Sequence, residues 1–285
     1  MLSNYIKKRL FYCAVLFFPP VICPSQGIVN TPGTKIVTNS NAKIVLNNAG
    51  FENNGTFSSG NSEVVFSGST ATANSYIGGS ASTSFYNLTL NKTANGLQLN
   101  RNIDITNTLL FANGDSLFLN EHNIDLGSTG ILSGETGTRR ITGRTGGYIQ
   151  STQLLDAPTG ANPGNLGLDI SSVSNLGNTV IRRGHQQQSG ASVYRYYDVI
   201  PTNNAGLEAT IVFNYFDTEL AGVSEGNLGM FYSTNGGTVW ANLGVDDIDQ
   251  SLNYLSVNAI DQLALFTLAN ISDPLAIKLI YLKAV

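Results

Sequence analysis

The sequence predicts an all-β fold, with an N-terminal parallel β-helix of about five coils of about 20 residues followed by an antiparallel β-sandwich. The first observation behind this prediction is an internal repeat between residues 41 and 134. The second is that this region lacks a long apolar stripe of 3.6-residue period, which argues against helical repeats. The third is a change near residue 136 to longer strands without that repeat.

The repeat has an offset of 20 and then 21 residues. Residues 41–46 return as 61–66, residues 97–100 as 117–120, and residues 102–105 as 123–126. Apolar and polar residues alternate within each copy, which indicates strands with one face inward and the other in solvent. A β-propeller blade would need about twice this period, so stacked coils of a β-helix are the better interpretation.

Polar residues mark the ends and corners of the predicted coils. Asn47, Asn100 and Asn120 follow strands, where a stacked amide is expected to bond to the next coil. Asn-Gly pairs at 54–55, 95–96 and 113–114 supply the positive φ that tight corners need. The β-helix domain is therefore assigned to residues 28–136, with residues 28–40 as an entry strand that covers its first edge.

Residues 1–27 have the pattern of a signal peptide. A basic run at 7–9 precedes an apolar run at 10–18, and Ser25-Gln26-Gly27 forms a small-x-small cleavage site. The expected mature chain begins at Ile28, carries no membrane span and is exported to the outside of the cell or its surface. A retained membrane anchor, or lipid attachment at Cys23, are the alternatives.

Composition and charge exclude several functions. The chain has 285 residues, 42% of them apolar and 12% charged. Without residues 1–27 it has 12 basic and 19 acidic residues, a net charge of −7 that argues against nucleic acid as a partner. Cys13 and Cys23 both precede Ile28, so the expected mature chain has neither thiol chemistry nor cysteine-bound metal.

The second domain, residues 137–272, is predicted as a β-sandwich after a loop at 156–164 that is rich in Pro and Gly. Its alternation places Val193, Arg195, Tyr197 and Val199 on one face of a single strand. Residues 273–285 are interpreted as a linker or as the start of a following module that is missing. Eight strands are expected, at 166–170, 179–182, 193–200, 210–216, 228–232, 239–243, 252–260 and 263–268.

Four stretches together resemble a known class of protein: residues 87–91 (Asn-Leu-Thr-Leu-Asn), 164–170, 194–199, and 266–269 ahead of Asp273-Pro274-Leu275. The order is similar to that in adhesin-like secreted or cell-surface proteins of bacteria with type IX secretion. The resemblance implies β-solenoid coils, a β-sandwich, a Pro-Leu joint and further modules with a C-terminal sorting domain. This chain ends before such a domain.

Basic residues concentrate in the second domain and suggest an anion-binding junction. An anionic glycan would be held by Arg139, Arg140, Arg144, Arg182, Arg183 and His185. The alternative is that these are surface charges and packed arginine stems. Tyr194, Tyr196 and Tyr197 offer rings for sugar stacking, although aromatic rows in strands also serve the core.

Residues 233–240 resemble the Asp-box hairpin of sialidases. Ser233, Asn235 and Gly237 would form the turn and Trp240 would pack beneath it, with Asn235 in place of Asp. A single copy favours a structural turn over a glycan hydrolase.

Two acidic groups are candidate sites. Asp246, Asp247 and Asp249 suggest either a calcium site or a solvated loop. Asp104 and Asp125 are expected to stack on adjacent coils and to face water, hold a cation or act as a carboxylate pair. No residue is assigned as catalytic and no cofactor is assigned.

The function expected from the sequence is a non-enzymatic extracellular or cell-surface module for structure or adhesion. Its partners would be glycans or surface polymers, with the β-helix as a spacer and the sandwich as a cap. The alternative is a secreted glycan-binding or glycan-cleaving protein of the lyase or hydrolase type.

Overall fold

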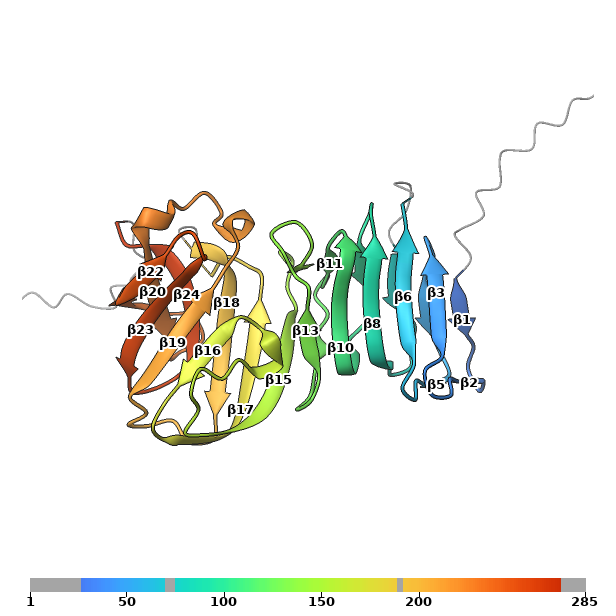
Figure 1. The fold of residues 1–285 in the computed structure, drawn as a ribbon, viewed down its shortest axis with the longest axis horizontal. Helices are drawn as coiled ribbons and strands as arrows, with labels where there is room; N and C mark the ends of the chain where they lie inside the picture. Colours follow the sequence, from blue (N-terminus) through green and yellow to red (C-terminus); the bar gives the residue numbers. More distant parts are fainter. Residues whose placement is uncertain (1–26, 70–74, 189–191, 273–285) are drawn as a thin grey trace, which may run out of the picture.

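The computed structural model describes residues 27–69, 75–188 and 192–272. The predicted signal peptide, apart from Gly27, and residues 273–285 lie outside the described residues. Coils occupy one end of the elongated molecule and a two-sheet sandwich the other (Figure 1). Within the described part, no helix is long and apolar enough to span a membrane.

The N-terminal part is a parallel β-solenoid of about five turns with two main sheets. One sheet contains, in order, β1 (Ile28–Asn30), β4 (Phe51–Asn53), β7 (Ser75–Gly78), β9 (Leu97–Leu99), β11 (Leu117–Phe118) and β14 (Ile141–Thr142). The other contains β3 (Lys43–Asn47), β6 (Glu63–Gly68), β8 (Ser84–Lys92), β10 (Ile103–Gly114), β12 (Ile124–Asp125) and β15 (Tyr148–Asp156). Three short strands complete the coils: β2 (Lys35–Val37), its partner β5 (Thr56–Ser58), and β13 (Ile131–Ser133), which pairs with β10.

The predicted stacking of like residues is confirmed. Ile44 pairs with Val64 in the parallel ladder. Leu97 pairs with Leu117, which is the same 20-residue offset. Ile103 pairs with Ile124, where the sequence offset is 21. The inward aliphatic side chains therefore form columns that bury one another between coils.

The solenoid core contains an aromatic cluster near its N-terminal end. The rings of Phe51, Phe57 and Phe85 have centroid separations of 5.1 to 5.7 Å. Phe51 and Phe85 are completely buried. Edge-to-face contacts of this kind stabilise a core beyond the area that the rings bury.

Buried asparagines connect successive coils. Asn30 Nδ2 donates to Asn53 Oδ1 at 2.7 Å, and Asn53 Nδ2 donates to the Ser82 carbonyl of the following coil at 2.9 Å. Asn120, which is exposed and follows a strand, also bonds between coils: its Nδ2 donates to the carbonyl of Leu99, one coil earlier, at 3.1 Å. These bonds satisfy polar groups that would otherwise destabilise the interior.

The C-terminal part is an antiparallel sandwich. From β15 the first sheet continues through β17 (Asn175–Gly184), β18 (Ser192–Pro201), β24 (Leu265–Asn270), β20 (Leu228–Ser233) and β21 (Ala241–Gly244). The second sheet contains β16 (Leu168–Ser171), β19 (Ala209–Asn214), β23 (Tyr254–Ile260) and β22 (Asp247–Asp249). Short 3₁₀ turns lie between strands: η1 (Pro163–Asn165), η2 (Asp217–Glu219) and η3 (Glu225–Asn227).

Strand β15 joins the two architectures. Its first residues pair in parallel with β12, and its whole length pairs antiparallel with β17. One 12-stranded sheet therefore runs through both parts of the described chain. Strand β14 pairs in parallel with β11, and β15 pairs in parallel with β12. Parallel pairing therefore continues beyond the boundary expected at residue 136, because the Gly- and Thr-rich stretch there still completes a last coil.

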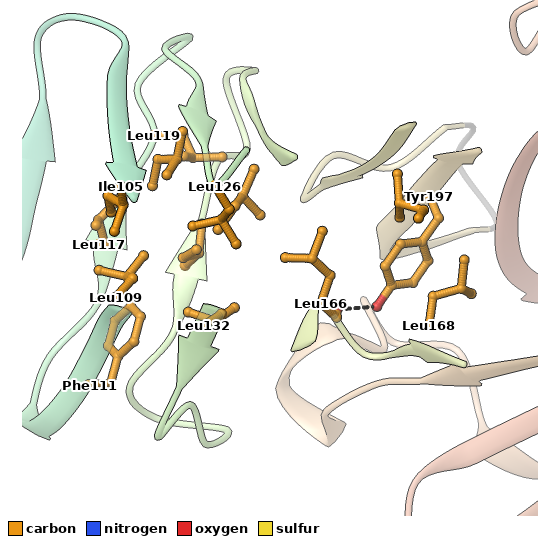
Figure 2. Packing of buried hydrophobic residues seen from close by; sticks show 14 of the residues in the cluster. Ile105, Leu109, Phe111, Leu117, Leu119, Leu126, Leu132, Leu166, Leu168 and Tyr197 are labelled. Atoms are coloured by element: carbon orange, nitrogen blue, oxygen red, sulfur yellow. Dashed lines mark hydrogen bonds between the residues drawn. The ribbon is translucent and has the colours of Figure 1, made fainter. Parts of the chain in front are cut away.

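The hydrophobic core is also continuous across this junction. Side chains of the last coils, such as Leu126 and Leu132, face Leu166 and Tyr197 of the sandwich (Figure 2). The Tyr197 hydroxyl donates to the Leu166 carbonyl at 2.7 Å. The expected common face of Val193, Arg195, Tyr197 and Val199 is the buried face of β18.

Candidate functional site

The basic residues expected at one junction site lie on different sides of the sheet. Arg183 and His185 are buried, and Arg140 approaches them from the last coil, directly before β14. Arg182 points to the opposite, outer face. Arg139 donates to the Gly134 carbonyl at 2.9 Å, and the exposed Arg144 lies over the Tyr194 ring at 4.2 Å.

The buried residues form an ionic network around Glu219, which ends the 3₁₀ turn η2. Arg195 Nε lies 2.8 Å from Glu219 Oε2, and its Nη2 donates to Oε1 at 3.0 Å. Arg140 Nε and His185 Nδ1 lie 3.5 and 3.3 Å from Glu219 Oε1. The peptide N–H of Phe216 donates to Glu219 Oε2 at 3.1 Å, which fixes the carboxylate against its own turn.

A second carboxylate extends the network into the solenoid. Arg183 Nη2 donates to Glu135 Oε1 at 2.8 Å, and Arg183 Nη1 donates to the Leu166 carbonyl at 2.9 Å. Glu135 Oε1 also accepts the Ile141 N–H at 2.8 Å. We name Glu135, Arg140, Arg183, His185, Arg195 and Glu219 the junction network. It ties the last coil of the solenoid to the first sheet of the sandwich and to η2, the turn that follows β19 of the second sheet.

The electrostatics of the junction network favour ionised carboxylates and a neutral histidine. Although burial opposes ionisation, Arg195 and the other neighbouring cations hold the pKa of Glu219 well below its usual range. Three arginines already exceed two carboxylates, so a further proton on His185 adds unbalanced charge. Burial, with Arg183 and Arg195 beside it, lowers the pKa of His185 to about 4.

This pKa predicts a loss of stability in mild acid. The unfolded histidine takes up a proton near its ordinary pKa of 6.5, whereas the folded one resists protonation until about 4. The contribution of the neutral His185 to folding stability is therefore complete above pH 6.5. It falls as the pH is lowered from 6.5 to about 4, because the unfolded state binds more protons in that range. We expect the urea midpoint to fall steadily between pH 6.5 and 4, and to fall less in His185→Gln. An identical pH profile for the two proteins would contradict the assignment.

The junction network is unsuited to binding a large ligand. Glu135, Arg183 and Arg195 border a cavity of about 200 Å³ that also contacts Tyr215 and Phe216. Ligand pockets are usually larger, about 300–1,000 Å³. The network is therefore a structural connection between the two parts of the chain.

The outer face of the 12-stranded sheet carries a polar ladder across the junction. Gln150 Nε2 donates to Asp125 Oδ2 of the last coils at 2.7 Å. Arg182 Nε donates to Gln150 Oε1 at 3.2 Å, and Arg182 Nη1 lies 3.5 Å from Asp198 Oδ2. These residues face one another in the strand register, so the ladder runs across β12, β15, β17 and β18.

The same face contains an open groove of about 650 Å³ beside this ladder. Its walls include Tyr148, Arg182, Tyr196 and Asp198, together with the rim of the hairpin at Ser233. We name this the outer groove. It combines two aromatic rings with one cation, one carboxylate and several amides.

A glycine determines how one of the rings lies. Gly184 is opposite both Tyr148 and Tyr196 in the sheet register. A Cβ atom on Gly184 would lie 2.1 Å from Cζ of Tyr196, so the tyrosine ring covers the glycine backbone. The Arg182 guanidinium lies 5.0 Å from the centroid of the Tyr148 ring. Tyr196 and Tyr148 thus present ring surface beside the charged pair Arg182–Asp198.

The stacked carboxylates lie at the solenoid end of the same face. Asp104 pairs with Asp125 in the parallel ladder, as the repeat predicts. Although Asp104 is exposed, partial loss of water at the sheet surface raises its pKa, and the Asp125 carboxylate raises it further. Asp125 is held by Gln150 and by the Gly127 N–H at 2.7 Å.

The hairpin between β20 and β21 has the geometry of a tight polar turn. Ser233 Oγ donates to Asn235 Oδ1 at 2.8 Å and accepts the Gly237 N–H at 2.9 Å. Asn235 Oδ1 also accepts the Val239 N–H at 2.9 Å. Trp240 is buried against Phe231 of β20 and Ala269 of β24 in the same sheet, so these residues shape the turn.

The acidic group at 246–249 is divided among separate hydrogen bonds. Asp246 accepts the Asn258 N–H, Asp247 accepts the Tyr254 hydroxyl, and Asp249 accepts the Ser251 N–H and hydroxyl. Strand β22 lies where a loop was expected. In the part of the chain that the structure describes, no three His, Cys, Asp or Glu residues gather as metal ligands would.

Several residues of both sites were not singled out from the sequence. Glu135 has no other charged residue within three positions, Glu219 lies two positions after Asp217 without a recognisable motif, and Tyr148 and Gln150 belong to a strand that the sequence does not predict. Alternation on β18 did indicate that Arg195 shares the face of Tyr197, which was a usable signal of a buried charge. Comparison with family models, curated proteins and solved structures gives no match.

Proposed function

We propose that this chain is a non-enzymatic, exported module that acts as a rigid spacer and adhesive surface. The observation that carries the proposal is β15, a single strand that belongs to the solenoid on one edge and to the sandwich on the other. A hinge at this point would have to break sheet hydrogen bonds, the continuous core and the junction network together.

Rigidity suits a spacer because a ligand site at the sandwich is then held at a fixed distance from the first coil. Exposed polar rows along the solenoid offer repeated weak contacts, which favour multivalent attachment to a surface. The signal-peptide pattern of residues 1–27 supports export.

The stacked pair Asp104–Asp125 favours a second candidate, a polysaccharide-cleaving enzyme. A raised pKa on one of two neighbouring carboxyls is an arrangement that an acid–base pair requires. Against it, Asp125 is engaged by Gln150 and by a backbone N–H, which is the environment of a structural carboxylate.

Three measurements test the proposal. Antibody labelling of intact cells of the source organism is expected to detect the protein, and deletion of its gene is expected to reduce attachment to surfaces. Small-angle X-ray scattering of the purified protein is expected to fit one rigid body. Labelling seen only after the cells are broken, or scattering that needs two independently moving bodies, would contradict the spacer role.

A reducing-sugar assay separates the second candidate. Incubation of the purified protein with soluble polysaccharides is expected to release no new reducing ends. Cleavage that disappears in both Asp104→Asn and Asp125→Asn, but not in the exposed control Asp156→Asn, would establish the enzyme instead.

A further inference from the structure

We propose that the outer groove binds a neutral polysaccharide chain. The inference goes beyond the spacer role, since a rigid module would serve that role with the groove empty. It rests on the shape of the groove, on its two partly exposed rings and on its balance of charge.

The rings supply the apolar part of the site. Tyr196 is held flat over Gly184, and Tyr148 lies across the same glycine from the neighbouring strand. A pyranose ring has a face of C–H groups that packs against such a surface, while its hydroxyls remain at the edge. Both tyrosines are only partly buried, so part of each ring remains open to solvent.

The polar groups supply hydroxyl partners without net charge. Arg182 and Asp198 compensate each other at 3.5 Å. Gln186 and Gln188 add side-chain amides, each of which both donates and accepts. A uronic-acid or sulfated polymer would need uncompensated cations here, but Arg183 and His185 are turned into the junction network.

The groove crosses several strands of the sheet, which suits a polymer. Its walls include Tyr148 of β15, Arg182 of β17, Tyr196 of β18, Leu265 of β24 and Ser233 of β20, and these strands are neighbours in that order. Neighbouring strands are about 4.8 Å apart, so a chain lying along the groove meets a new side chain at every strand. The groove is open rather than enclosed, which admits internal segments of a long chain as well as its ends.

Affinity gel electrophoresis and calorimetry with the purified protein test the inference. The neutral probes are a soluble β-glucan and a galactomannan, and the anionic probes are polygalacturonate and alginate. We expect binding to at least one neutral probe, weakened about tenfold by Tyr196→Ala and by Tyr148→Ala. The matched control is Tyr194→Ala, on the same strand and face but outside the groove, which is expected to bind as the parent does.

Gly184→Ala provides a second route to the same result. The added methyl group would overlap the Tyr196 ring and must displace it. The φ angle of Gly184 is not positive, so alanine suits the backbone there and the variant is expected to fold. Binding of the neutral probe is therefore expected to weaken. Circular dichroism of each variant checks the fold. Three outcomes would overturn the inference. The protein could bind neither neutral probe, Tyr194→Ala could weaken binding as much as Tyr196→Ala does, or the anionic probes could bind more tightly than the neutral ones in a salt-sensitive way. None of these outcomes changes the scattering or cell-surface results that test the spacer role.

Discussion

Replacement of Glu219 by glutamine is expected to lower the free energy of unfolding by about 3 kcal/mol, because it leaves buried cations without their counter-charge. Glu219 is 1% exposed and lies within 3.5 Å of Arg140, Arg195 and His185. Glutamine keeps the shape of the side chain, so the loss measures charge rather than a cavity.

Urea denaturation followed by circular dichroism measures this effect. The matched control is Glu208→Gln, an exposed acid in the loop before β19, for which a change of less than about 0.5 kcal/mol is expected. Equal unfolding free energies for the two variants would show that the junction network contributes no stability through charge. A changed denaturant slope in Glu219→Gln would instead show that the variant changes the surface exposed on unfolding or no longer unfolds in one step.

Truncation of Phe85 to alanine is expected to cost about 3–5 kcal/mol, the usual range for a buried phenylalanine. Its ring is 0% exposed and lies 5.5 Å from that of Phe51 and 5.7 Å from that of Phe57. The coils cannot collapse onto the cavity, because each is held in register by strands on both sides.

Differential scanning calorimetry distinguishes two outcomes for Phe85→Ala. Because sheet and core are continuous, the whole molecule is expected to unfold in one transition at a lower temperature. The control Tyr86→Ala changes the next, partly exposed residue and is expected to shift the transition less. Two transitions, of which only one has a lower midpoint temperature in Phe85→Ala, would show that the solenoid and the sandwich unfold separately. That result would weaken the argument for a rigid spacer.

The coil architecture was predictable because stacking imposes a sequence rule. A residue such as Val64 buries the residue 20 positions before it, so the same residue type recurs at the same offset. Coils of other lengths were not predicted: Phe51 pairs with Ile77, an offset that the repeat at 41–66 does not suggest. Residues inserted at a corner lengthen a coil without changing how its strands stack, so the sequence offset between stacked residues is no longer constant.

The sites were harder to predict because their parts are distant in the chain. Arg183 and Glu135 are brought together only when the last coil and the sandwich pair through β15. Charged residues usually lie at the surface, so composition alone argued for an exposed basic patch. The outer groove depends on Tyr148, which follows two glycines and looked like part of a loop.

The placement of paired strands along the chain sets the order in which the protein can assemble as it is synthesised. Each solenoid strand finds its partner one coil earlier, as Val64 does with Ile44, so coils can add one at a time to a growing end. Strand β18 must wait for β24, because Ser192 lies opposite Ala269 near the end of the described chain. Closing that long loop is entropically slow. We therefore expect a nascent chain to present a finished rod with an unfinished cap, and the edge of β18 to be its most aggregation-prone surface until synthesis passes β24.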